Sequence, residues 1–204
     1  MKLAIGTAQF GMPYGVSNSS GQTSQIEVRK ILDMSAAHGI DTLDTAAAYG
    51  ESESILGAVG VSGWNVITKI PPSFTTVGHG RDYVLGCVKA SLVNLKLDRL
   101  EGVLLHAPEE IVSARGSEII FGLQEAKSIG LVKKIGYSIY SSNDLHPLLE
   151  VHKPDIVQLP LNVFDQRAIV SGWIEKLTRQ NIEIHARSVF MQGLLLMNST
   201  RRPD

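Results

Sequence analysis

The run Leu100-Glu101-Gly102-Val103-Leu104-Leu105-His106 is a short, almost wholly apolar stretch that ends in a histidine. Such a run predicts a β-strand, and the lack of polar alternation is expected where both faces of a parallel sheet are covered. The pair Ile156-Val157, followed by Gln158, repeats the arrangement later in the chain. A buried strand with a polar residue at its carboxyl end is therefore the unit from which the fold can be worked out.

Short apolar runs of this kind alternate with stretches of helical periodicity along the whole chain. The predicted strands are Lys2–Thr7, Asp41–Asp44, Asn65–Lys69, Leu100–His106, Lys133–Ser138, Asp155–Leu159 and Ile182–Arg187. The predicted helices are Ser24–His38, Ser52–Leu56, Arg81–Leu95, Arg115–Ile129, Ser142–Val151 and Gln166–Arg179. Gly39 and Gly130 are expected to end two of the helices. Because each helix would join two parallel strands by a right-handed crossover, the pattern indicates a repeated βα unit.

Such units build either a doubly wound sheet or a barrel. Gly6, Gly11 and Gly15 lack the spacing of a dinucleotide-binding glycine turn, which argues against the doubly wound sheet. Polar residues instead stand at or next to the carboxyl ends of successive strands: Asp44, Lys69, His106, Ser138, Gln158 and Arg187. Catalytic residues gather at that face of a TIM barrel. We therefore predict an α/β fold, a TIM (β/α)8-type barrel with about seven βα units.

Length and composition narrow the class of protein further. The chain has 204 residues, which fits a single domain over residues 1–204. Hydrophobic residues make up 44% and charged residues 19%, so the chain can bury a core. The net charge of −1 argues against a nucleic-acid partner. Because Cys87 has no disulfide partner and neither an export signal nor a membrane span is recognisable, we expect a cytoplasmic protein.

Three of these strand-end residues, Asp44, Lys69 and His106, form a set with Tyr49 in the loop after Asp44. The set suits carbonyl reduction, in which carbon receives a hydride and oxygen receives a proton. Tyr49 is the candidate proton donor. Its hydroxyl normally titrates near pH 10, so a cation such as Lys69 is needed to stabilise the phenolate. Asp44 would keep Lys69 charged in a partly dry pocket, and His106 would donate a hydrogen bond to the carbonyl oxygen. The predicted catalytic set is thus Asp44, Tyr49, Lys69 and His106.

The same residues carry a resemblance to a known family. Asp44-Thr45-Ala46-Ala47-Ala48-Tyr49-Gly50, followed by Ser52-Glu53, Lys69 and His106, resembles the active-site pattern of the aldo-keto reductases, and Gly6–Gly11 resembles their first strand and loop. The resemblance implies a (β/α)8 barrel that reduces aldehydes or ketones, its small-molecule substrates, with NADPH, with NADH as the alternative. The amino-acid sequence of Gln9–Gly15 is most similar to that of bacterial members of the family from sugar and surface-polysaccharide pathways.

The resemblance also implies a set of cofactor-binding residues. Ser138 and Gln158 stand at the strand ends where the family binds the nicotinamide carboxamide. Arg187, Ser188 and Gly193 match the segment after the seventh strand that contacts the cofactor, although many members carry a stacking aromatic residue in place of Arg187. No pair of histidines has the spacing of a metal site, so we predict no metal.

The end of the chain departs from this pattern. Val189–Met197 is expected to be an apolar loop, and no eighth strand follows it, so we expect a C-terminally truncated barrel. Unpaired first and seventh strands would permit self-association through the sheet edges. Two alternatives therefore stay open. One is a catalytically impaired barrel that acts as a binding or scaffold module, and the other is an isomerase or lyase that uses Lys69 as a Schiff-base amine.

Overall fold

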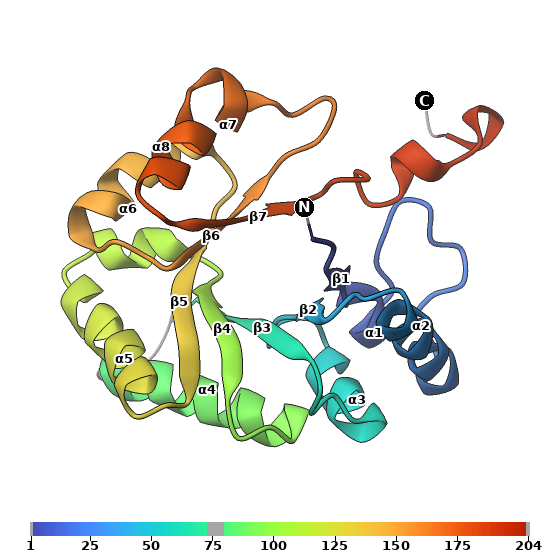
Figure 1. Cartoon of the computed structure of the whole chain (residues 1–204), viewed down its shortest axis with the longest axis horizontal. Helices are drawn as coiled ribbons and strands as arrows, with labels where there is room; N and C mark the ends of the chain where they lie inside the picture. Colours follow the sequence, from blue (N-terminus) through green and yellow to red (C-terminus); the bar gives the residue numbers. More distant parts are fainter. Residues whose placement is uncertain (1, 73–79, 203–204) are drawn as a thin grey trace.

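One sheet of parallel strands, each beside its neighbours in the sequence, forms the centre of the computed structural model, which describes residues 2–72 and 80–202. Its 7 strands are β1 (Ile5–Gly6), β2 (Thr42–Asp44), β3 (Asn65–Ile70), β4 (Leu100–Leu105), β5 (Val132–Ser138), β6 (Ile156–Pro160) and β7 (Glu183–Arg187). The sheet curls, and the helices cover its outer face (Figure 1). This arrangement confirms the predicted α/β barrel class, and β1 and β7 form the two ends of the sheet.

The helices lie between the strands, as predicted. They are α1 (Ala8–Gly11), α2 (Gln25–Ala37), α3 (Ser52–Val59), α4 (Gly80–Leu95), α5 (Gly116–Ser128), α6 (Leu145–Val151), α7 (Arg167–Val170) and α8 (Trp173–Arg179). Short 3-10 turns complete the described elements: η1 (Pro108–Val112), η2 (Ser142–Asp144), η3 (Leu194–Leu196) and η4 (Ser199–Arg201).

Local sequence signals set the bounds of α2. The hydroxyl of Ser24 accepts a hydrogen bond from the backbone N–H of Glu27, which satisfies a donor left free in the first turn. The helix ends at Ala37, and His38 is its C-cap residue. Gly39 follows with a φ of 75°, a conformation that glycine adopts without strain. The predicted end of this helix is therefore confirmed.

The core lies on both faces of the sheet. A large cluster of apolar side chains fills the space between the outer face of the strands and the helices. A small separate cluster fills the inside of the curl and consists of Ile67, Leu104 and Ile156. Because strands covered on both faces need apolar residues on both, these two clusters account for the nearly continuous apolar runs in the sequence.

Some predicted segments differ from the structure. The first strand covers only Ile5–Gly6 rather than Lys2–Thr7, because α1 begins at Ala8 and takes the chain out of the sheet. The predicted helix Gln166–Arg179 is divided into α7 and α8. Gly172 lies between them with a φ of 75°, which is incompatible with a continuous right-handed helix. The predicted loop Val189–Met197 contains the 3-10 turn η3.

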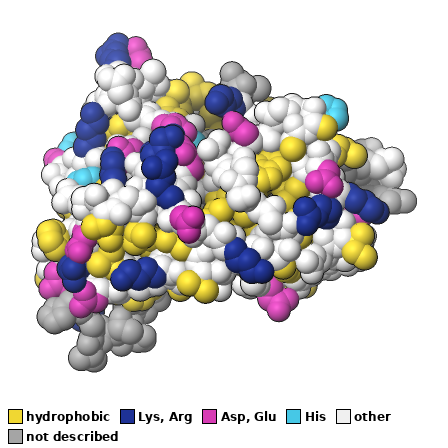
Figure 2. Space-filling view, turned by 60° about the horizontal axis from the view of Figure 1, so that its bottom comes forward, with side chains coloured by type: hydrophobic (Ala, Val, Ile, Leu, Met, Phe, Trp, Pro, Cys, Tyr) yellow, Lys and Arg dark blue, Asp and Glu magenta, His cyan; other side chains and the backbone are white. Residues whose placement is uncertain are grey.

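The surface shows no strong separation of charge on the face displayed in Figure 2, where basic and acidic side chains are interspersed between apolar patches. This distribution agrees with the near-zero net charge of −1. Among the described residues, no helix combines the length and the apolar character needed to cross a membrane.

Candidate active site

The inside of the barrel leads directly to a polar cluster at the carboxyl ends of the strands. The interior apolar cluster consists of Ile67, Leu104 and Ile156. Two positions further along each of these chain segments stand Lys69, His106 and Gln158. Side chains two residues apart in a strand point to the same face. The interior face of the strands therefore changes from apolar to polar at the mouth of the barrel.

An ion pair lies at the centre of this cluster. The Nζ of Lys69 donates hydrogen bonds to Oδ1 of Asp44 at 2.7 Å and to the backbone oxygen of Thr45 at 3.0 Å. The side chain of Lys69 is only 1% exposed, and that of Asp44 is 20% exposed. Burial lowers the pKa of Lys69, while the carboxylate of Asp44 acts in the opposite direction. The geometry agrees with the expectation that Asp44 holds the lysine charged.

Tyr49 lies against this ion pair in the loop after β2. The Nζ of Lys69 is 5.1 Å from the centroid of the Tyr49 ring. The ring of His106 meets that of Tyr49 edge to face, with the centroids 6.0 Å apart and an angle of 84° between the planes. The structure thus brings the four side chains of the predicted catalytic set together.

The pKa of the Tyr49 hydroxyl is raised in this structure. Burial is the main cause that raises the pKa of Tyr49, and the negative charge of Asp44 raises it further. Lys69 lies over the ring of Tyr49, and the cation that lowers this pKa is Arg187. The pKa of His106 is lowered by burial and by the charges of Lys69 and Arg187, so its ring is neutral at pH 7.

Two of the predicted cofactor-binding residues connect to the same cluster. Ser138 donates from Oγ to Oε1 of Gln158 at 3.1 Å, and the side-chain amide of Gln158 donates to Oδ1 of Asp44 at 2.8 Å. Both side chains are buried. A continuous set of hydrogen bonds therefore runs from the end of β5 across β6 and β2 to Lys69 on β3.

The remaining predicted residues lie further along the chain. Arg187 ends β7, and its guanidinium donates from Nη2 to the backbone oxygen of Ile139, the residue after Ser138, at 2.9 Å. Ser188 follows, and its backbone oxygen accepts a hydrogen bond from Asn162 at 3.1 Å. Gly193 has a φ of 90° and packs so closely on Ser17 that an added Cβ would lie 1.9 Å from its Oγ. Arg187 therefore reaches the cluster, whereas Gly193 contacts the segment after β1.

A buried hydroxyl cluster supports the site and was not predicted. Ser52, at the start of α3, donates from Oγ to the backbone oxygen of Thr7 at 3.0 Å and to its Oγ1 at 2.9 Å, and it lies 3.1 Å from Oγ1 of Thr45. All three residues are fully buried. Since the backbone oxygen of Thr45 binds Lys69, the cluster fixes one of the two partners of the lysine.

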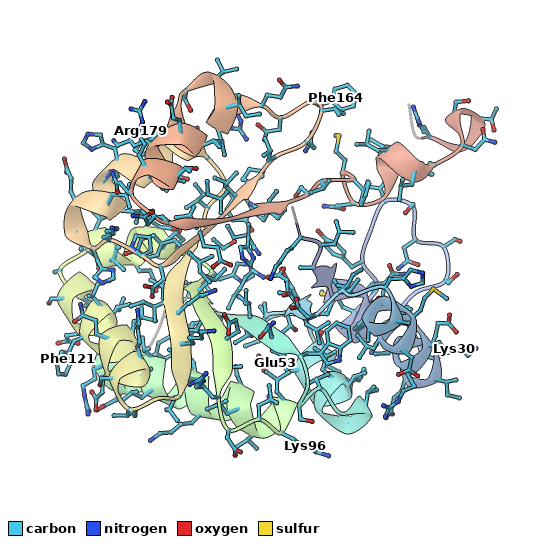
Figure 3. All side chains as sticks on the ribbon, in the orientation of Figure 1. Lys30, Glu53, Lys96, Phe121, Phe164 and Arg179 are labelled. Carbon is cyan, nitrogen blue, oxygen red and sulfur yellow. The ribbon has the colours of Figure 1, made fainter. Side chains whose placement is uncertain are left out.

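A buried acid lies behind the same strand. The side chain of Glu53, labelled in Figure 3, is buried, and its carboxylate accepts a hydrogen bond from Thr68 at 2.6 Å. Thr68 directly precedes Lys69. The run Ser52-Glu53 was part of the motif seen in the sequence, but only the fold shows that both side chains point inward.

Polar residues at the carboxyl ends of the strands of an α/β barrel define the class of protein as one with an enzyme-type barrel. The chain matches the sequence profile of the Aldo/keto reductase family over residues 2–204 and belongs to this family.

Individual relatives are similar in sequence and fold. Aldo-keto reductase pigE of Monascus ruber is 25% identical over 95% of this chain and 60% of its own length. Aldo-keto reductase AKR11C1 of Bacillus halodurans (holo form) superposes with a TM-score of 0.77 at 22% identity, covering 100% of this chain and 65% of that chain. For Bombyx mori AKR2E4, solved with NADP, the TM-score is 0.66 at 25% identity, with coverage of 91% and 62%. The chain thus spans less than two thirds of the length of these relatives.

Proposed function

We propose that this chain carries the reducing centre of an NAD(P)H-dependent aldo-keto reductase, which converts an aldehyde or ketone to an alcohol. The observation that carries the proposal is the buried ion pair of Lys69 and Asp44 placed against the rings of Tyr49 and His106. Membership of the Aldo/keto reductase family supports it, as does the NADP bound to the related Bombyx mori enzyme.

The residues at the ends of β5 and β6 suit a nicotinamide carboxamide. Ser138 and Gln158 are neutral groups that both donate and accept hydrogen bonds, as a carboxamide requires. We keep Ser188 and Gly193 as proposed contacts of the cofactor, with NADPH as the expected form and NADH as the alternative, whereas the contacts of Arg187 favour a different ligand. When bound, the reduced nicotinamide supplies the hydride that the carbonyl carbon receives.

We assign the role of proton donor to the hydroxyl of Tyr49. Its raised pKa keeps the hydroxyl protonated at neutral pH, so a proton is available for the carbonyl oxygen. Loss of that proton leaves a phenolate beside cations, which stabilise it. His106, neutral at pH 7, donates a ring N–H to the same oxygen and orients it.

Lys69 acts as a fixed cation in this proposal. A Schiff base would require a free amine that a carbonyl carbon can reach. The amine of Lys69 instead contacts Asp44 and Thr45 and is almost completely buried. This arrangement favours reduction over the isomerase or lyase alternative.

The proposal is tested by following NADPH oxidation with a panel of aldehydes and ketones. We expect Tyr49→Phe to lower kcat by about 10²–10⁴-fold, because only the proton donor is removed. Tyr137→Phe is the matched control, since its hydroxyl binds the backbone oxygen of His152 at the end of α6. Equal activity of the wild type and Tyr49→Phe would contradict the assigned role, and a wild type that neither binds nor oxidises NADPH would overturn the proposed function.

A further inference from the structure

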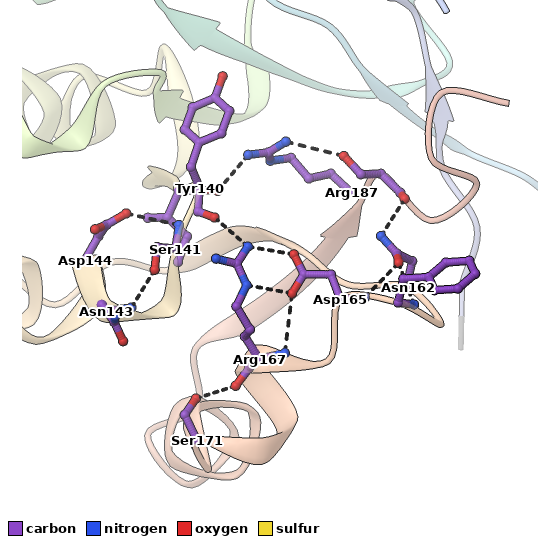
Figure 4. A network of polar contacts seen from close by, with 12 residues as sticks. Tyr140, Ser141, Asn143, Asp144, Asn162, Asp165, Arg167, Ser171 and Arg187 are labelled. Atoms are coloured by element: carbon purple, nitrogen blue, oxygen red, sulfur yellow. Dashed lines mark hydrogen bonds and ion pairs between the residues drawn. The ribbon is translucent and has the colours of Figure 1, made fainter. Parts of the chain in front are cut away.

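The guanidinium of Arg187 is a cationic group at the mouth of the barrel. Its guanidinium stacks on the ring of Tyr140, with Cζ 4.3 Å from the ring centroid, and reaches from the end of β7 across β6 to the end of β5 (Figure 4). The backbone oxygen that it binds belongs to Ile139, which directly follows Ser138 of the candidate site. Its charge acts on the pKa values of three members of the proposed catalytic set, Tyr49, Lys69 and His106.

The hydrogen-bonding capacity of this guanidinium is only partly used. An arginine side chain offers five N–H donors. Nη2 makes the bond to Ile139, and Nη1 makes a long one of 3.4 Å to Oγ of Ser188. Nε is buried and has no hydrogen-bond partner among the described residues. The two Nη groups together carry four N–H donors and make only these two bonds, so they can also donate to an acceptor on a ligand.

The positive charge of Arg187 is also uncompensated. Asp165, the nearby carboxylate on which its charge acts, already binds Arg167 through two bonds of 2.8 and 2.7 Å (Figure 4). Asp44 is paired with Lys69. Within the described ranges, no carboxylate forms an ion pair with Arg187. Since His106 is neutral at pH 7, the mouth of the barrel carries an excess of one positive charge.

We propose that Arg187 binds a compact anionic group, a carboxylate or phosphate, on the carbonyl substrate and so selects anionic aldehydes or ketones. This inference rests on the proposed function, because it names the substrate class of the same site. A planar guanidinium matches the two oxygens of a carboxylate or phosphate, which adds geometric selectivity to the attraction of charge. An uncharged substrate of the same shape would leave the cation unpaired.

Pairs of substrates that differ only in charge provide the test. Glyoxylate, succinate semialdehyde and 4-formylbenzoate, which place the carboxylate at increasing distance from the carbonyl, are each compared with the uncharged amide, with NADPH as cofactor. We expect a higher kcat/KM for the acid in at least one pair. Arg187→Gln should reduce that acid-to-amide ratio about tenfold to a hundredfold, and Arg187→Lys should restore part of it. Arg179→Gln, at an exposed arginine of α8 that pairs with Glu175, is the matched control and should leave the ratio unchanged.

Direct binding separates this inference from the proposed function. Calorimetric titration of the 204-residue chain with benzoate and with inorganic phosphate should show binding that Arg187→Gln abolishes. If the wild type reduces no substrate but still binds these anions through Arg187, the anion site stands, whereas the proposed function and with it the selection of anionic substrates fail. Ratios that are the same in the wild type and in Arg187→Gln would overturn the inference. The same holds for an Arg187→Gln variant that weakens NADPH binding alone, which would assign the cation to the cofactor.

Discussion

The environment of Lys69 sets the electrostatics of the candidate site. A lysine that is 1% exposed loses nearly all of its hydration, and such a charge is retained only where a partner compensates for the loss. Asp44 at 2.7 Å and the backbone oxygen of Thr45 supply that compensation. The ion pair therefore places a fixed cation and a fixed anion beside His106, and the titration of this histidine reports on both.

We predict that the pKa of His106 lies below its usual 6.5 and moves in opposite directions in two variants. Lys69→Met removes a cation that disfavours the protonated ring, so the pKa should rise. Asp44→Asn removes the anion that favours it, so the pKa should fall. NMR titration of the histidine rings measures both, with His106→Gln to assign the signal.

A lysine on the surface provides the control for this titration. Lys30 on α2 is 66% exposed, and Lys30→Met should leave the signal of His106 where it is. The lowered pKa of His106 also determines how this residue affects the stability of the fold as the pH changes. Because the pKa of His106 is lowered in the folded chain, its ring binds fewer protons there than in the unfolded chain. Its contribution to the free energy of unfolding therefore falls as the pH drops below 6.5 towards the pKa of the folded state. Unchanged titration in both variants would show that the ion pair does not act on His106.

At the scale of elements, α1 and α3 hold the loop that carries Tyr49. The backbone N–H of Glu51 donates to the oxygen of Gly11, the last residue of α1, at 3.2 Å. The N–H of Ser52, the first residue of α3, donates to the oxygen of Tyr49 at 3.0 Å. A Cβ at Gly11 would lie 1.8 Å from that same oxygen. Only glycine therefore permits the close approach of α1 to the loop.

We predict that Gly11→Ala lowers the free energy of unfolding by about 1–3 kcal/mol, because the loop must move away from the added methyl group. Tyr49 moves with the loop, so kcat should fall as well. Gly86→Ala is the matched control. Gly86 is an exposed position of α4 where an added Cβ meets nothing within 4 Å, and the change there should stabilise the chain by about 0.5–1 kcal/mol. Urea unfolding measures both, and a Gly11→Ala variant as stable as Gly86→Ala would contradict the argument.

The elements also show which parts of the molecule can be predicted from its sequence. Buried parallel strands are apolar on both faces and end in polar residues, so Lys69 and Gln158 could be placed at a common mouth from local sequence alone. The division of α7 from α8 depends on one backbone angle at Gly172, and a helical periodicity does not reveal it. The contact of Ser52 with Thr7 joins residues 45 positions apart, and the stacking of Arg187 on Tyr140 likewise depends on the fold.

At the scale of the whole molecule, the sheet of the described residues ends in two edge strands, β1 and β7, each of which pairs with one neighbour. Two backbone hydrogen bonds to the residues that flank β6 define the orientation of β7. The N–H of Glu183 donates to the oxygen of Asp155, and the oxygen of Arg187 accepts from the N–H of Leu161. Because alternate residues of a strand direct their backbone groups to opposite sides, the N–H and oxygen of Ile184 and Ala186 point away from β6. These groups form an edge at which another strand can add.

We predict that the 204-residue chain self-associates through this edge, in a manner that depends on its concentration. Ala186→Pro removes a backbone donor on the free side and leaves the bonds to β6 in place, so it should shift the chain towards the monomer. Sedimentation velocity over a range of concentrations measures the change. His185→Pro, whose N–H lies on the side of β6, is the control that should destabilise the sheet itself, as seen in thermal unfolding. If Ala186→Pro folds normally and associates as strongly as the wild type, another surface joins the copies and the edge of β7 has no part in it.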